Sequence, residues 1–449
     1  MDEKKQIDMS GLLRELPMTP RRYSLLLIVS MVMVFEGYDT MIIPYVMPKL
    51  GPLWHLTPIE NGALASYGFI GLLIGSIVLG PTADRFGRRR VMIFGLIWFS
   101  IFTGLAMFAN GYGSFAVFRV LGGFGIGGVM PISASIAAEY APPQRRGFWV
   151  SSVYAGFIVG WVLSAVMAML IIPPFGWRGM FLVGLIPILY AAVLARWLPE
   201  SLQILVKWGR PDQVRKTLCR LGYLQFANDD FDFHLDELEE SHALAQIGLL
   251  FKDGMGRTTV LLWVASFFTL LFMYGYATWL PTLMVKNGHG LVRSYSYSLA
   301  VDVAQVAGNL IMGTFMDRFG AKRVTIVYFV LLSLSVVLFG VNPTNAYIYV
   351  FSILVGLFTA VQAGINTTMA HIYPANVRAS GIGWNAGVGR LGSIFGPVVV
   401  GWLAAYPMTL EGYMVAFAVM SLLAMLAVAL SPIRYERLSP NPLGEASVS

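Results

Sequence analysis

Five ionisable residues lie inside long apolar stretches of this chain of 449 residues. They are Glu36, Asp39, Arg119, Asp302 and Arg390. A charge at the depth of a lipid hydrocarbon core is costly, so each of these residues is a candidate for binding or moving an ion. A carboxyl group can take up and release a proton, and a guanidinium group can hold an anion. The five residues therefore indicate ion-binding and proton-transfer chemistry.

Glu36 and Asp39 are three residues apart, so on a helix they share one face. At 1.5 Å per residue, Asp39 lies roughly 10 Å and Arg119 roughly 6–8 Å below the outer ends of their helices. These depths predict a carboxylate–guanidinium pair. Two hypotheses remain open: the two carboxyl groups couple transport to protons, or the pair is static and joins two helices.

Arg390 lies near the middle of a glycine-rich helix that runs from Arg378 to Pro397. Its planar, permanently charged guanidinium group suits a carboxylate, so we expect it to anchor an anionic substrate, with Arg119 as a second cation. The alternative is a permanent partnership with an internal carboxylate such as Asp302. Asp302 could instead carry a proton, and it lies roughly 12 Å from the outer end of its helix.

Aromatic and amide side chains in the same stretches could surround a planar organic molecule. In such a chain, however, most aromatic residues serve packing or lie at the membrane interface. The expected substrate-lining residues besides the arginines are Tyr274, Trp279, Gln362, Asn366, Trp384 and Asn385.

The elements that position these residues are membrane-spanning helices. Hydrophobic residues make up 57% of the chain and charged residues 12%, against about 25% charged residues in soluble domains. The chain has no alternating strand pattern, and its first 20 residues are polar without a signal peptide. Runs of about 20 apolar residues predict twelve spans. They are 23–46, 61–80, 91–110, 114–137, 148–172, 177–197, 259–283, 294–315, 323–341, 346–369, 380–404 and 411–431.

The distribution of positive charge predicts the topology. Of the 31 Lys and Arg residues, 25 fall on the side of the two termini, four fall in the opposite loops, and two lie within spans. This bias places both termini in the cytoplasm and explains the net charge of +7 without nucleic acid. We expect a cytoplasmic segment 1–22, a six-helix bundle 23–197, a cytoplasmic loop 198–258, a second six-helix bundle 259–431 and a cytoplasmic tail 432–449.

The central loop holds an acidic run. We expect a solvated linker with short amphipathic helices, although a partner-binding role is an alternative. The acidic residues are Asp229, Asp230, Asp232, Asp236, Glu237, Glu239 and Glu240.

The two halves repeat a loop motif at an offset of 233 residues, which predicts two pseudo-symmetric bundles. We expect the glycines to allow close helix approach, the aspartates to bind a neighbouring helix N-terminus, and the arginines to bridge carboxylates. Such contacts would form a conformational latch; the alternative is that these loops only set topology. The latch residues are Gly80, Asp84, Arg85, Gly87, Arg88, Gly313, Asp317, Arg318 and Gly320.

These loops resemble the most diagnostic motif of the major facilitator superfamily, and the resemblance covers essentially the whole chain. The Glu36-Gly-Tyr-Asp39 segment and the helix around Arg390 resemble the aromatic acid:proton symporter branch. Glu36 replaces the usual Asp, and Pro44 the usual Gly. The resemblance implies secondary active import of an organic carboxylate, which we expect to be aromatic, with protons by alternating access. It also implies a monomer in the plasma membrane, the inner membrane of a bacterium, with no cofactor, metal or catalytic residue.

Two other functions remain open. The first is transport of another metabolite, such as a sugar, polyol or aliphatic acid, since Pro199-Glu200-Ser201 resembles a sugar-porter motif. The second is a membrane sensor that binds solute without moving it. An enzyme is disfavoured because no zinc-protease, nucleophile-elbow or phosphate-loop motif occurs. The single cysteine, Cys219, excludes an intramolecular disulfide.

Overall fold

The computed structural model describes residues 5–9, 12, 16–142, 145–226, 231–234, 247–252, 254–341, 344–373 and 375–432. Within these residues, twelve helical segments are long and apolar enough to cross a membrane, which confirms the expected number. Most extend a few residues beyond the apolar runs. The first six spans are α2 (Pro20–Leu53), α3 (Pro58–Phe86), α4 (Arg88–Leu105) continued by η1 (Ala106–Phe108), α5 (Tyr112–Tyr140), α6 (Arg146–Phe175), and α7 (Arg178–Val183) with α8 (Ile186–Trp197). The second six are α12 (Gly256–Lys286), α13 (Leu291–Phe319), α14 (Ala321–Val341), α15 (Asn345–Phe358) with α16 (Val361–Ile372), α17 (Ala375–Leu403) and α18 (Leu410–Leu430).

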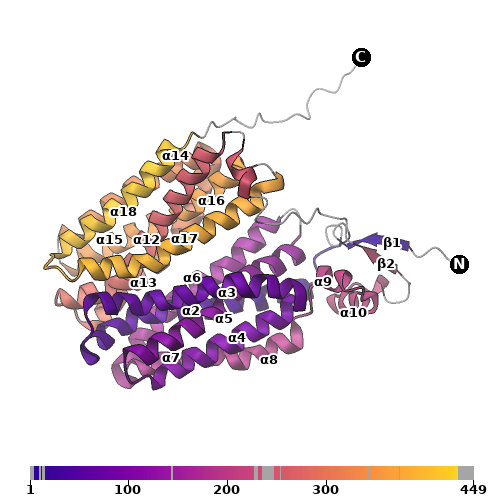
Figure 1. Ribbon diagram of the computed structural model, residues 1–449, viewed down its shortest axis with the longest axis horizontal. Helices are drawn as coiled ribbons and strands as arrows, with labels where there is room; N and C mark the ends of the chain where they lie inside the picture. The colour runs from indigo at the N-terminus through magenta and orange to yellow at the C-terminus, as the bar shows by residue number, and fades with distance from the viewer. Residues whose placement is uncertain are drawn as a thin grey trace, which may run out of the picture.

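The spans form two bundles that lie side by side, one from each half of the chain (Figure 1). Strand β1 (Lys5–Asp8), helices α9 (Leu202–Lys207) and α10 (Pro211–Leu221) and strand β2 (Phe231–His234) gather beyond one end of the first bundle. We call this end of the molecule the terminal side and the opposite end the far side. Helix α2 runs from the terminal side to the far side, and α3 returns.

Local sequence signals explain where helices begin and end. Thr57 caps α3: its side chain accepts from the amide of Glu60, and the Glu60 carboxylate accepts from the amide of Thr57 at 2.8 Å. Gly87 and Gly320 end α3 and α13 with φ angles of 103° and 87°, a region that favours glycine. Both glycines belong to the repeated loop motif, so the motif turns the chain from one span into the next.

The recorded polar and ring contacts between the two bundles lie toward the far side or at mid-depth of the spans. Ser66 of α3 donates to the carbonyl of Ile394 in α17 at 2.5 Å. Tyr295 of α13 donates to the carbonyl of Tyr45 in α2 at 2.6 Å, and the two rings meet edge to face. The described residues show no such contact between the bundles near the terminal side. The molecule is therefore closed at its far side.

The segment before α2 and the central loop fold together on the terminal side. Arg22 is fully buried and donates to the carbonyl of Tyr140 at 2.7 and 3.0 Å, to that of Leu16 and to the hydroxyl of Tyr223. Thr19 donates to the carbonyl of Leu221 at the end of α10. These contacts fasten α10 to the start of α2 and the end of α5.

The central loop contains the short helices expected from the sequence. The apolar residues Val214, Leu218 and Leu221 of α10 are buried, so this helix is amphipathic. Strand β2 pairs in parallel with β1, aligning Phe231 with Lys5, and no strand was expected here. Two short 3-10 turns, η3 (Leu224–Phe226) and η4 (Gly248–Phe251), complete the described loop. Most of the acidic run lies outside the described residues, namely Asp229, Asp230, Asp236, Glu237, Glu239 and Glu240.

Candidate functional site

Asp39 and Arg119 form a buried ion pair inside the first bundle. The two side chains lie 3.1 Å apart and are 1% and 4% exposed. Thr103 of α4 donates to the same Asp39 oxygen at 2.5 Å, so the group joins α2, α4 and α5. Helix register explains the contact, because both residues lie at similar depth in their spans. Arg119 therefore compensates the charge of Asp39, and the ion pair links helices within the first bundle.

Glu36 lies one turn nearer to the terminal side on the same face of α2. It is fully buried, and neither carboxylate oxygen has a hydrogen-bond partner among the described residues. The charges of Arg390 and, more weakly, of Asp39 act on it. A buried carboxylate without hydrogen bonds is costly, so it is either protonated or held by a nearby cation. Glu36 is therefore suited to exchange a proton.

Arg390 faces Glu36 from the other bundle. It is partly buried on α17, and it interacts electrostatically with Glu36, Tyr274 and Tyr154. These four residues come from α17, α2, α12 and α6, which are two helices of each bundle. The group lies near the middle of the spans, where a solute would contact both halves at once. We call these four residues the central group.

Aromatic rings surround the central group. The ring of Tyr274 lies 4.7 Å from that of Phe69 and 5.9 Å from that of Trp161, both with tilted or edge-to-face geometry. Phe157 continues the cluster at 5.6 Å from Trp161. The indole nitrogen of Trp161 is buried without a partner among the described residues. Phe69 and Phe157 were not predicted from the sequence. A phenylalanine in an apolar run carries no signal that tells whether it lines a binding site or only packs against neighbouring helices.

Asp302 lies apart from Arg390. It is 5% exposed, and its recorded side-chain partner is the hydroxyl of Tyr45 at 3.5 Å. Arg390 does not contribute to its electrostatic environment. The alternative that Asp302 is the permanent partner of Arg390 is therefore wrong in this conformation. Asp302 lies instead at the closed far side, beneath the contact between Tyr45 and Tyr295.

Trp279 is placed differently from the expectation. It is fully buried, its indole nitrogen donates to the carbonyl of Pro397 at 2.8 Å, and its ring lies beside Gly62 of the first bundle. Five residues separate it from Tyr274, which is more than one helical turn toward the far side. Trp279 therefore seals the contact between the bundles, and the structure does not bring it to the central group.

The amide side chains lie on α16 and α17. Gln362 donates to the hydroxyl of Ser266 at 3.2 Å and to the side-chain oxygen of Asn366 at 3.3 Å, and Asn366 is exposed. Asn385 is 1% exposed, and neither its amide nitrogen nor its oxygen has a partner among the described residues. Trp384 is partly buried beside Trp263. Asn385, one and a half turns before Arg390, is thus a buried amide without a recorded partner.

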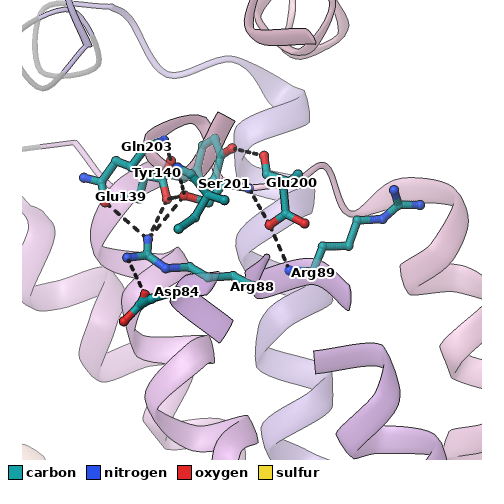
Figure 2. Close-up of polar contacts among 9 residues, drawn as sticks. Asp84, Arg88, Arg89, Glu139, Tyr140, Glu200, Ser201 and Gln203 are labelled. Carbon is teal, nitrogen blue, oxygen red and sulfur yellow. Dashed lines mark hydrogen bonds and ion pairs between the residues drawn. The ribbon is translucent and has the colours of Figure 1, made fainter. Parts of the chain in front are cut away.

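The loop motif of the first bundle forms a polar network on the terminal side (Figure 2). Arg88 contacts Glu139 at 3.0 Å, and also Ser201 and Gln203. Glu200 accepts from the amide of Arg89 at 3.1 Å. These acceptors were not predicted as latch residues, because they lie 50 to more than 100 residues away from Arg88 and Arg89 along the chain.

Parts of the latch prediction are wrong in this conformation. A side chain added at Gly80 or Gly313 would meet nothing within 4 Å, so neither glycine permits a close helix approach here. The side chain of Asp84 is 65% exposed, and its recorded contact is Arg88 at 3.8 Å rather than a helix N-terminus. Asp317 is also exposed. Neither aspartate therefore makes the expected contact with a helix N-terminus in this conformation.

The arginines that follow these aspartates lie over phenylalanine rings. Arg85 is 5.5 Å from the ring centre of Phe86, and Arg318 is 5.4 Å from that of Phe319. In the second bundle, Ala321 stands at the position of Arg88, so the network of the first bundle has no counterpart there. Lys322 instead donates to the carbonyl of Ser431 at 2.6 Å.

Comparison with known proteins identifies the fold and the relatives. The profile of the Major Facilitator Superfamily matches residues 29–301 and again 294–448. The benzoate transport protein of Acinetobacter baylyi is 29% identical over 89% of this chain and 87% of its own length. The niacin transporter NiaP of the same organism is 32% identical, covering 88% and 90%. The gallate transporter of Pseudomonas putida is 29% identical, covering 88% of each chain.

Two solved structures share the fold. A partially occluded inward open form of the xylose transporter XylE from E. coli superposes with a TM-score of 0.72 at 18% identity, over 96% of this chain and all of its own. A bacterial homologue of the human lysosomal transporter Spinster, in an inward-facing and unoccupied form, gives a TM-score of 0.71 at 17% identity, over 92% and 97%.

Proposed function

Because the chain belongs to the major facilitator superfamily, a family of transporters and not of enzymes, we propose that it imports an aromatic carboxylate together with protons by alternating access. The named relatives support the substrate class. Benzoate, gallate and niacin are each a planar ring with one carboxylate, and their transporters match this chain over nearly its full length. The single observation that carries the proposal is the central group, where Glu36 faces Arg390 across the two bundles.

The substrate carboxylate binds Arg390 in this mechanism. The guanidinium fork offers two parallel donors, which match a carboxylate. The aromatic ring of the substrate then lies among Tyr274, Trp161 and Phe69. The ring of Tyr274 meets the other two edge to face, and the substrate ring adds a further contact of this kind. The unpartnered amide of Asn385 supplies a hydrogen bond to a ring substituent.

Glu36 carries the proton. With the site empty, the charge of Arg390 stabilises the Glu36 carboxylate. When a substrate carboxylate takes over Arg390, Glu36 loses this compensation and binds a proton. Release of the substrate restores the electrostatic compensation of Glu36 by Arg390, and the proton leaves. With one proton per monoanion, transport would be electroneutral and driven by the pH gradient alone; a second proton, carried by Asp302, would add an electrical term.

Asp302 and Asp39 have secondary roles in this proposal. Asp302 is a second proton carrier that becomes accessible when the far side opens and Tyr45 separates from Tyr295. Asp39 shares its face of α2 with Glu36 and pairs with Arg119. It thus contributes negative potential to Glu36 rather than a proton of its own.

We further propose that the terminal side is cytoplasmic and that the membrane is the plasma membrane, the inner membrane of a bacterium. The excess of Lys and Arg on this side supports the orientation. The structure then represents the inward-facing form, because the bundles meet at the outer side. We propose that the protein acts as a monomer. In the outward-facing form, Asp84 and Asp317 engage the opposite bundle. Residues 198–258 link the two bundles, 23–197 and 259–431.

Uptake into proteoliposomes tests the proposal. A pH gradient, acidic outside, should drive accumulation of labelled benzoate above its external concentration. Glu36→Gln keeps the shape of the side chain but cannot carry a proton, so we expect it to abolish accumulation and to retain benzoate exchange. Glu411→Gln, at an exposed position, is the matched control and should behave as the wild type.

Competition then identifies the substrate class. Niacin and gallate should compete with benzoate, whereas xylose and acetate should not. Accumulation by Glu36→Gln equal to the wild type would refute proton coupling through this residue. Competition by xylose alone would refute the aromatic carboxylate and favour a sugar.

A further inference from the structure

A cavity of about 290 Å³ lies on the terminal side, outside the central group and the loop network. It is formed where the first turns of α2, the end of α8 and helix α10 meet. Three arginines, Arg21, Arg196 and Arg220, line it together with Trp197 and the aliphatic residues Leu25 and Ile28. None of these residues takes part in the proposed transport mechanism.

Two of the three arginines donate to main-chain carbonyls rather than to carboxylates. Arg21 donates to the carbonyl of Arg220 at 2.8 Å, and Arg220 donates to the carbonyl of Arg196. Among the described residues none of the three forms an ion pair with an acid, and no acidic side chain lines the cavity. Three positive charges thus converge on one cavity, and no described acidic residue compensates them. A bound anion would relieve their mutual repulsion.

The other wall of the cavity is apolar and belongs to the membrane-facing surface. Leu27 of α2 and Leu189 of α8 are 64% and 76% exposed, which marks both helices as lipid-facing. Trp197, at the last residue of α8, is 62% exposed. Tryptophan is enriched where the hydrocarbon meets the headgroups, so the cavity lies at headgroup depth. The cations therefore lie beside a surface that accepts acyl chains.

We propose that this cavity binds an anionic phospholipid, with its phosphate on Arg21, Arg196 and Arg220 and its acyl chain along Leu25, Ile28 and Trp197. Basic pockets between spans at the membrane surface bind such headgroups. A soluble phosphate shares the charge but makes no use of the apolar wall. The bound lipid joins the start of the first span to α10, and so holds the central loop against the membrane.

Equilibrium binding of labelled phosphatidylglycerol to the purified full-length protein in neutral detergent tests the proposal. Phosphatidylcholine with the same acyl chains, inorganic phosphate and glycerol phosphate serve as competitors. We expect phosphatidylglycerol to bind and phosphatidylcholine to compete poorly. Since each cation near a membrane surface contributes about 1 kcal/mol, the variant Arg21→Gln/Arg196→Gln/Arg220→Gln should bind roughly a hundredfold more weakly.

Two further variants separate charge from structure. Arg196→Gln removes a side chain that makes no recorded hydrogen bond, so the fold stays intact while binding weakens about fivefold. The control Arg210→Gln/Lys216→Gln/Arg257→Gln removes three exposed cations outside the cavity and should bind as the wild type. Unchanged binding by Arg196→Gln and the triple cavity variant would overturn the proposal. Displacement of the lipid by equally low concentrations of inorganic phosphate would assign the cavity to a soluble anion instead.

Discussion

At the scale of single residues, two arginines within the spans, Arg119 and Arg390, have different surroundings. Arg119 has a carboxylate partner at 3.1 Å inside its own bundle, whereas Arg390 forms no ion pair among the described residues and faces Glu36 from the opposite bundle. An arginine already bonded to an acid has few N–H donors available for a substrate. An unbonded one at the boundary between the bundles is free to bind and release.

Arg390→Lys tests the need for a planar fork. Lysine keeps the positive charge but cannot donate two parallel hydrogen bonds, so we expect the KM for benzoate to rise about tenfold or more, with a smaller effect on the maximal rate. Initial rates of uptake into proteoliposomes measure both quantities. Arg378→Lys, an exposed position on the same helix, should leave both unchanged. An unaltered KM in Arg390→Lys would remove Arg390 from the substrate site.

A double-mutant cycle tests the pair between Asp39 and Arg119. Removing one member leaves a buried charge uncompensated, so Asp39→Asn and Arg119→Gln should each destabilise the protein by about 3–5 kcal/mol. The double variant should lose much less than the sum of the two, because neither charge is then stranded. Thermal unfolding in detergent provides the measurement, and simple additivity would contradict the contact.

At the scale of elements, the loop between α3 and α4 depends on one glycine. Gly87 has a φ of 103°, and a side chain added there would lie 2.4 Å from the carboxylate of Glu200. Gly87→Ala should therefore break the contact between Glu200 and Arg89 and lower stability by about 1–3 kcal/mol. Gly80→Ala, within the same motif but in open space, should be neutral or stabilising by up to about 1 kcal/mol. Melting temperatures of the two variants give the comparison, which fails if both shift equally.

The elements also reveal what the sequence could and could not predict. The spans follow from apolar runs about 20 residues long, and the contact between Asp39 and Arg119 follows from counting depth along two helices. Both can be deduced from residue types and positions along the chain alone. The partners of Arg88 could not be predicted, because Glu139 and Ser201 reach it only through packing of distant segments. The role of Trp279 is likewise set by the opposite bundle, which no helix periodicity specifies.

At the scale of the whole molecule, the two bundles meet at the far side, and the described residues show no polar or ring contact between them near the terminal side. Tyr154, which interacts electrostatically with both Glu36 and Arg390, is 38% exposed. This exposure, close to the central group and toward the terminal side, indicates the path by which a solute leaves. A conformational change that closes this side would bury Tyr154.

Cysteine labelling tests this path. In a Cys219→Ser background, Tyr154→Cys should react with a membrane-impermeant thiol reagent applied from the terminal side, and benzoate should slow the reaction several-fold. Tyr406→Cys, 55% exposed just beyond α17 on the far side, should react only from that side and regardless of benzoate. Labelling of Tyr154→Cys exclusively from the far side would contradict the closed far side described here.

The pairing of β1 with β2 has a consequence for biosynthesis. Lys5 aligns with Phe231, so β1 must wait for a partner strand that is made 226 residues later. At translation rates of about 5–20 residues per second, that delay is roughly 10–45 s. Six helices enter the bilayer during the interval while the leading end stays unpaired. Completion of this small sheet therefore marks the moment at which the first half of the newborn chain is finished.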